Sequence, residues 1–238
     1  MSDLTAMMWK EIAEFLGNRR FFLTFSVAVL AMGILPALTF ANHQIPGMSS
    51  PLMAMIRSMY ALFAAVVVVA QTAPDLVLHE RVGHTLDYLL TTRLSDRAIF
   101  AAKVLVASMV GYCAAMVATG VQLVASGLLG GGGFHWLFLV PPIGRVVVFG
   151  FAAALSLYVA VIGTFVALRV GEQRAAYMLT LLSIGLLLVP FLAGWLHIQP
   201  TMYWMVRAAL VFGAFTVALG LFGLSVFRRH MLVLYLQE

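Results

Sequence analysis

The chain has 238 residues, of which 63% are hydrophobic and only 10% are charged, and its formal net charge is +5. Too few polar side chains remain to cover a water-soluble domain of this size, so the composition excludes a soluble globular protein and indicates an integral membrane protein. The positive charge does not predict nucleic-acid binding, since it follows from the distribution of Arg and Lys around the membrane spans.

Residues 1–20 are predicted to form an amphipathic helix on the inner membrane surface. One stripe at helical spacing is apolar, and the charged residues of the segment lie on its other faces. The stripe consists of Leu4, Met8, Ile12, Phe15 and Leu16, and the charged set of Asp3, Lys10, Glu11 and Glu14. The same pattern also suits a helical stub that continues the first span.

Six apolar runs follow along the chain. Each is close to or longer than the about 20 residues with which a helix crosses roughly 30 Å of hydrocarbon. They cover Phe21–Ala41, Met53–Val77, Ala98–Leu128, Ile143–Leu168, Ala175–Leu196 and Tyr203–Val226. The connections are too short for a separate soluble domain, and the strand alternation of a membrane barrel is missing. We therefore expect an all-α integral membrane protein in which residues 21–238 form one domain with six transmembrane helices.

Arginine and lysine predict the orientation of these spans. Of the 14 basic residues, eleven fall on one side of the membrane: Lys10, Arg19, Arg20, Arg81, Arg93, Arg97, Lys103, Arg169, Arg174, Arg228 and Arg229. The positive-inside rule assigns this side to the cytoplasm, so both termini are expected there, in a multi-pass protein of the cell (inner or plasma) membrane. Asp75, near the inner end of the second span, is expected at the interface, where Arg81 or Arg174 can pair with it.

No group of residues in the sequence predicts catalysis or a metal site. The chain has only two lysines, Lys10 and Lys103, and neither completes a GxxxxGK[ST] phosphate-binding loop. Cys113 is the single cysteine and cannot form an intrachain disulfide. The outer-loop histidines lack the spacing of a metal site. We expect no catalytic residue, no metal and no cofactor in this chain.

The most charged stretch lies between the second and third spans, over residues 80–103. Pro74 disfavours an uninterrupted helix just before it, so a new element is expected to start there. From residue 78 apolar positions recur at helical spacing, which predicts a short amphipathic helix over about residues 78–94 on or just beneath the membrane. Ser95 is placed to cap the third span, and Arg97 and Lys103 are expected to anchor that end to lipid headgroups.

The order of residues in this stretch resembles the motif of ABC transporter permeases of the type-2 exporter class. That motif runs Glu-Arg-Glu-x-Gly-Thr-Leu-(Glu/Asp), then Leu-Leu, then Thr-Pro-Leu-Ser, and ends a few residues later in Gly-Lys or Ala-Lys. The matching residues here are Glu80, Arg81, Thr85, Leu86, Asp87, Leu89, Leu90, Thr92, Leu94, Ser95 and Lys103. Val82, His84 and Arg93 depart from it, standing where the motif has Glu, Gly and Pro.

The resemblance implies that residues 78–94 form a cytoplasmic coupling helix that docks onto a separate ATP-hydrolysing subunit. The residues expected to face that nucleotide-binding partner are Glu80, Arg81, Thr85, Asp87 and Arg93. ATP and Mg would be bound by the partner, and a second permease copy, as a homodimer or heterodimer, would complete the pathway. This chain would then be a transport subunit and not an enzyme, exporting an amphipathic or lipid-like substrate. The alternative is an ion-coupled secondary carrier or channel that needs no ATPase.

Three basic residues lie away from the cytoplasmic side. Arg57, Arg145 and Arg207 each fall near the outer end of a predicted span, the second, fourth and sixth. One interpretation is that they line the substrate path and attract an anionic group. The other is that their long side chains reach towards lipid headgroups. The sequence leaves both interpretations open.

Overall fold

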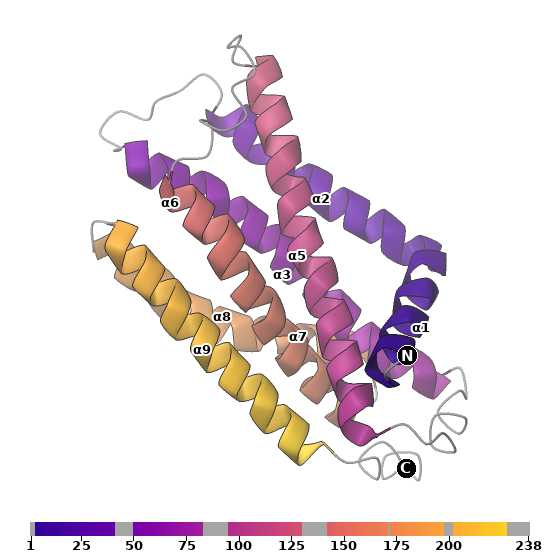
Figure 1. Cartoon of the computed structure of the whole chain (residues 1–238). Coiled ribbons are helices and arrows are strands. Elements are labelled where there is room, and N and C mark those ends of the chain that lie inside the picture. The colour runs from indigo at the N-terminus through magenta and orange to yellow at the C-terminus, as the bar shows by residue number, and fades with distance from the viewer. Residues whose placement is uncertain are drawn as a thin grey trace.

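A computed structural model of the chain describes residues 3–40, 50–82, 95–129, 142–170, 172–197 and 202–227. Throughout these ranges the regular elements are helices, with no strand among them (Figure 1). They are α1 (Asp3–Gly17), α2 (Arg19–Phe40), α3 (Ser50–Val82), α5 (Asp96–Leu129), α6 (Pro142–Arg145), the π-helix η1 (Val146–Phe151), α7 (Ala152–Arg169), α8 (Gln173–His197) and α9 (Met202–Val226). The expected all-α class is confirmed for this part of the chain.

Five helical stretches among the described residues are long and apolar enough to cross a membrane. They are Phe22–Thr39, Ile56–Leu78, Asp96–Leu128, Val146–Arg169 and Tyr203–Val226. Each falls on one of the predicted spans, because a continuous apolar run of this length forms a helix that satisfies its own backbone hydrogen bonds. The remaining predicted span, Ala175–Leu196, falls within the 25-residue helix α8.

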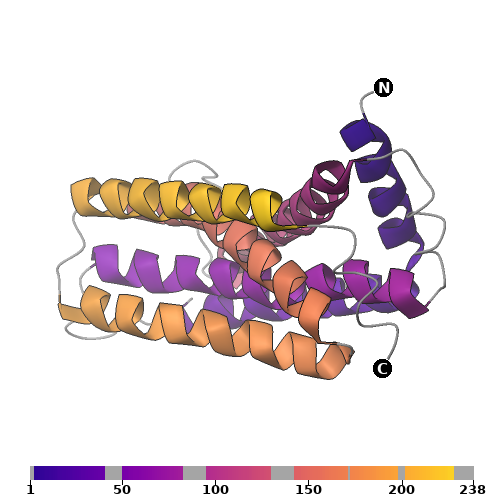
Figure 2. The ribbon, with the colours of Figure 1, turned by 90° about the horizontal axis from the view of Figure 1, so that it is seen from below.

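Helices α3, α5 and α7 form the centre of the bundle, and α2, α8 and α9 pack around them. The apolar window of α3 is 78% buried, whereas that of α9 is only 11% buried. Figure 2 shows α7 passing between α8 and α9, which lie on opposite sides of it. Side chains of α3 and α7 therefore make most of the core, and α9 turns its apolar surface outward.

Small residues allow the central helices to approach closely. A Cβ at Gly111 in α5 would overlap Val69 of α3 and lie 3.2 Å from the Ser156 hydroxyl of α7. A Cβ at Gly163 in α7 would lie 2.9 Å from Ala73 of α3. Because lipid tails are as apolar as the side chains they would replace, helix association in a membrane depends on such close packing.

The structure differs from the sequence-based expectation at Pro74. Helix α3 runs through this residue without interruption and ends at Val82. The side chains around it, Ala73 and Val77, are fully or almost fully buried, and the Pro74 ring lies against Gly163 of α7. Packing on α7 therefore keeps the segment helical even though proline lacks the N–H that would bond to residue 70.

A π-helical turn interrupts the fourth span. Residues Val146–Phe151 form η1 between α6 and α7, and the Ala152 N–H donates to the carbonyl of Val147, five residues earlier. The side chains of Val147, Val148 and Phe151 in this turn are buried. Tertiary packing on α3 and α9 holds the wider turn, which no residue pattern in the sequence indicates.

Replacing Gly111 with alanine is expected to destabilise the bundle, because the added methyl group would displace Val69. Overpacking of this kind costs roughly 1–3 kcal/mol. A Cβ at Gly120 of the same helix would have no neighbouring atom within 4 Å, so this position provides the control. Thermal unfolding of the purified protein in detergent should show a lower midpoint for Gly111→Ala and no loss for Gly120→Ala. Equal midpoints would contradict the close packing described here.

Candidate functional site

The predicted coupling residues lie at the junction between α3 and α5. Glu80 and Arg81 belong to the last turn of α3, and the roles assigned to their side chains stay predictions. Thr85, Asp87 and Arg93 lie outside the described residues, as does most of the predicted helix 78–94, whose first residues continue α3. The structure thus defines the two helices that bound this stretch, and their adjoining ends lie at the same, lower end of the bundle in Figure 1.

Ser95 caps the start of α5, as the sequence predicts. The Ala98 N–H donates a 3.2 Å hydrogen bond to the Ser95 hydroxyl, which satisfies one of the free donors at the helix start. Asp96 in the first turn places a negative charge near the positive end of the helix dipole. This cap fixes where α5 begins after the charged stretch.

Lys103 occupies a site that the sequence did not predict. Its Nζ lies 3.0 Å from Glu11 Oε1 and donates a 2.6 Å hydrogen bond to the carbonyl oxygen of Leu76. The two charged side chains are 4% and 1% exposed. The expectation that Lys103 reaches lipid headgroups is therefore wrong, since its charge is neutralised inside the protein between α1, α3 and α5.

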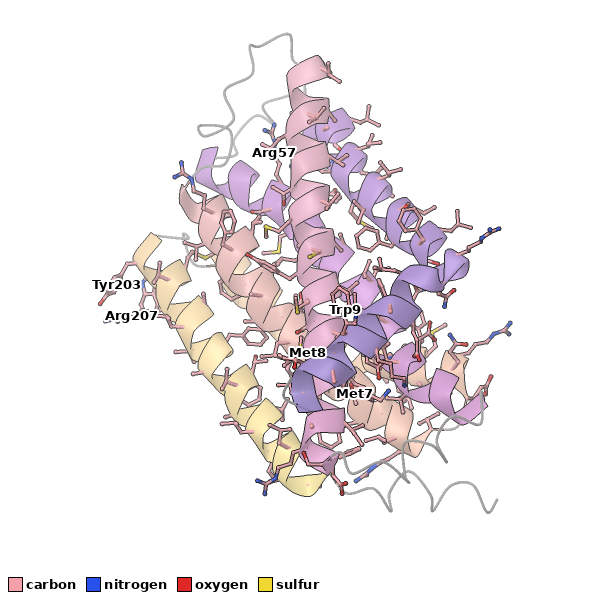
Figure 3. All side chains as sticks on the ribbon, turned by 45° about the vertical axis from the view of Figure 1, so that its right-hand side comes forward. Met7, Met8, Trp9, Arg57, Tyr203 and Arg207 are labelled. Atoms are coloured by element: carbon pink, nitrogen blue, oxygen red, sulfur yellow. The ribbon has the colours of Figure 1, made fainter. Side chains whose placement is uncertain are left out.

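The apolar stripe of α1 explains how Glu11 reaches this position. The stripe packs against the bundle rather than against lipid, and its members in contact with the core are Leu4, Met8, Ile12 and Phe15. Met7 is buried together with Ile99 and Ala102 of α5. By contrast Trp9 is 70% exposed, and Leu16, a member of the predicted apolar stripe, is 71% exposed. Figure 3 labels Met7, Met8 and Trp9 on this helix.

A second polar contact lies at the inner end of α3. The Gln173 side-chain amide at the start of α8 donates to the Asp75 carboxylate. Asp75 is partly buried there, and its place at the membrane interface stays a prediction. Its pairing with Arg81 or Arg174 stays a prediction, although Gln173 is the immediate neighbour of Arg174 in the chain.

The three outer arginines differ in their surroundings. Arg57 in α3 is partly buried, whereas Arg145 and Arg207 are exposed. The Arg207 guanidinium lies over the ring of Tyr203, one turn earlier in α9, with its central carbon 4.0 Å from the ring centre. Figure 3 shows the Tyr203–Arg207 pair apart from Arg57, at the edge of the bundle. A role of the three arginines in a substrate path stays a prediction.

Across the part of the chain that the structure describes, no three His, Cys, Asp or Glu side chains come together in a group that could hold a metal ion. Cys113 is exposed on α5 with a free thiol. The Lys103–Glu11 and Gln173–Asp75 contacts connect helices to one another.

The sequence model of the ABC-2 family transporter protein matches residues 12–172, from α1 through the end of α7. This match defines the class as a membrane transport component. Because it covers more than half of the chain, the protein belongs to the ABC-2 transporter family and is a permease of the ABC-2 type. The family resemblance of the charged stretch is confirmed. A comparison with curated proteins found no match.

Removing Lys103 is expected to destabilise the protein strongly. The substitution Lys103→Met leaves the Glu11 carboxylate buried without its cation, and breaking a buried pair in this way costs roughly 3–5 kcal/mol. The double variant Glu11→Met/Lys103→Met removes both charges and should recover most of this loss. Unfolding midpoints in detergent measure both effects.

The other lysine offers a matched control. Lys10 pairs with Glu14 of the same helix at 3.5 Å, with both side chains over a third exposed. Exposed pairs four residues apart contribute at most about 0.5 kcal/mol, so Lys10→Met should leave the midpoint nearly unchanged. Similar losses in Lys10→Met and Lys103→Met would refute the importance assigned to the buried pair.

Proposed function

We propose that this chain is the six-span permease subunit of an ATP-driven ABC exporter, with both termini in the cytoplasm. A separate nucleotide-binding subunit binds ATP and Mg and acts on the chain through the coupling helix at about residues 78–94. The observation that carries the proposal is the family match over residues 12–172, which includes this charged stretch. A permease has no nucleotide site of its own and depends on a partner for energy.

The helix lengths support six spans. With a rise of 1.5 Å per residue, the 25 residues of α8 extend over about 38 Å, enough to cross roughly 30 Å of hydrocarbon. Adding α8 to the five apolar stretches gives an even number of spans. An even number returns the chain to the side on which it started, which agrees with the arginines and lysines near both ends of the chain.

The lengths of α3 and α5 support access to the coupling segment from the cytoplasm. These helices have 33 and 34 residues and are therefore about 50 Å long. For a helix of about 50 Å to fit within roughly 30 Å of hydrocarbon by tilting alone, its axis would have to tilt by about 50° from the bilayer normal. Transmembrane helices usually tilt by about 0–40°. Part of each helix therefore extends past the hydrocarbon, and the charged residues lie where α3 ends and α5 begins. A soluble ATPase can reach residues 83–94 in this arrangement.

A second copy of the permease, identical or related, completes the transport path in this proposal. The peripheral helices α2 and α8 are available to it, and exposed apolar side chains such as Val27 in α2 and Leu182 in α8 suit a contact within the membrane. The alternating opening of the path follows from movement of the spans when ATP brings the partner subunits together. The apolar composition favours an amphipathic or lipid-like substrate over a strongly polar one.

Copurification tests the proposed partner. The tagged permease, solubilised in mild detergent, should retain an ATPase that mass spectrometry identifies by its phosphate-binding loop. Charge reversal by Glu80→Arg or Arg81→Glu should reduce the amount retained at least tenfold, because both residues belong to the docking stretch. Arg169→Glu at the end of α7, an exposed arginine on the same side, serves as the control. Retention by both reversed variants would argue against the coupling role.

The outer arginines are predicted to differ in their effect on transport. In proteoliposomes containing the complex and a fluorescent phosphatidylglycerol, Arg57→Gln should reduce ATP-dependent movement of the anionic lipid at least fivefold. Arg207→Gln should change it less than twofold, because Arg207 is exposed and stacks on Tyr203, whereas Arg57 is partly buried in the central helix α3. Arg145→Gln should have an intermediate effect on transport, because Arg145 is exposed but lies directly before η1. Equal tolerance of all three substitutions would rule out the path interpretation.

A further inference from the structure

Lys103 of α5 contacts two other helices, α1 and α3. The ammonium pairs with Glu11 of α1 and donates to the Leu76 carbonyl of α3, at 3.0 and 2.6 Å. An ammonium group has three N–H donors, so one side chain can hold both partners at the same time. Because α3 ends and α5 begins on either side of residues 83–94, Lys103 connects the N-terminal helix to both helices that bear this stretch.

The burial of this contact determines how it responds to force. Apolar contacts such as those of Met7 with Ile99 are non-directional, and they allow one helix to slide along another. A buried ion pair does not allow this, since separation would leave both charges in apolar surroundings. The exposed pair between Lys10 and Glu14 lies within a single helix and carries no such constraint between helices.

The contact also extends to the first span. Helix α1 ends at Gly17 and α2 begins at Arg19, so one residue, Asn18, separates them. The Asn18 N–H donates to the Phe15 carbonyl, and the Phe22 N–H donates to the Asn18 carbonyl. These two hydrogen bonds restrict the movement of α1 relative to α2. A movement of α1 therefore reaches α2 directly.

We propose that Lys103 is a positioning residue that makes α1 move together with the inner ends of α3 and α5. A displacement of residues 83–94 by the ATPase then reaches α3 and α5 directly, and it reaches α1, with the start of α2 that follows it, through Glu11. This inference rests on the proposed function, in which an ATPase acts on that stretch. Without Lys103 the same displacement moves α3 and α5, while α1, held by apolar contacts alone, can slide along them.

Hydrogen–deuterium exchange of the full-length protein in lipid nanodiscs tests the contact without any partner. Lys103→Met should accelerate amide exchange at least tenfold both in α1 and in the last turns of α3, residues 76–82, since both lose a partner. Lys10→Met, the matched control, should change exchange less than twofold. Acceleration confined to α1 would refute the connection to α3, and no acceleration in either would refute the three-helix contact.

The complex with its copurified ATPase tests the movement. On addition of ATP and vanadate, the wild-type protein should change its exchange in α1, in residues 76–82 and in residues 95–103. The variant Glu11→Met/Lys103→Met keeps α1 docked through apolar contacts, which exchange without nucleotide will verify. In this variant the response of α1 should fall to less than a fifth, while the responses of α3 and α5 persist. A full α1 response in the double variant overturns the proposal.

The two experiments separate this inference from the proposed function. If no ATPase copurifies with the wild-type protein, the proposed function fails, and the nanodisc comparison of Lys103→Met with Lys10→Met still decides whether the three helices are joined. If the ATPase binds and α1 fails to respond to nucleotide in the wild-type complex, the positioning role is wrong and the proposed function stands.

Discussion

A lysine ammonium held in apolar surroundings requires a carboxylate beside it and further acceptors for its remaining protons, and this requirement at Lys103 determines how the inner end of the molecule is assembled. Glu11 must face α5, so α1 is turned with its apolar stripe against the bundle and with Trp9 outward. Because α2 follows after a single residue, the same contact sets where the first span begins.

Away from this site, several polar side chains of the described spans bond within their own helix. Hydroxyl groups in the central helices donate to the carbonyl four residues earlier in their own helix, as in Thr72 to Val68, Ser156 to Ala152 and Thr164 to Ala160. Such bonds satisfy the hydroxyl without fixing a neighbouring helix. The fit of the bundle then depends on close approach at Gly111 and Gly163, where van der Waals contact replaces the hydrophobic driving force of a soluble core.

The properties that are local in sequence were predictable. The apolar runs predicted the spans, and the order of residues from Glu80 to Lys103 predicted the family. The contact of Glu11 with Lys103 joins positions 92 residues apart, so no local pattern contains it. The sequence signal for this contact was the position of Lys103 within an apolar run, in a chain that has only two lysines. From the sequence alone, this lysine is interpreted as an anchor to lipid headgroups. Helix continuity through Pro74 was missed because it depends on packing against α7.

The π-helical turn in the fourth span has a consequence for the outer end of the molecule. A π turn accommodates one residue more than regular α-helical geometry, and each residue of an α-helix corresponds to about 100° of rotation around the axis. The direction in which Arg145 leaves the helix is therefore offset by about this angle from the face that the α7 pattern alone would assign to it. Deleting a single residue between Val146 and Phe151 would restore a regular helix and leave the parts of the span on either side facing as they do now, because the wider turn takes up the extra residue. The chain can thus differ in length by one residue at this turn while the packing of the helix on either side is kept.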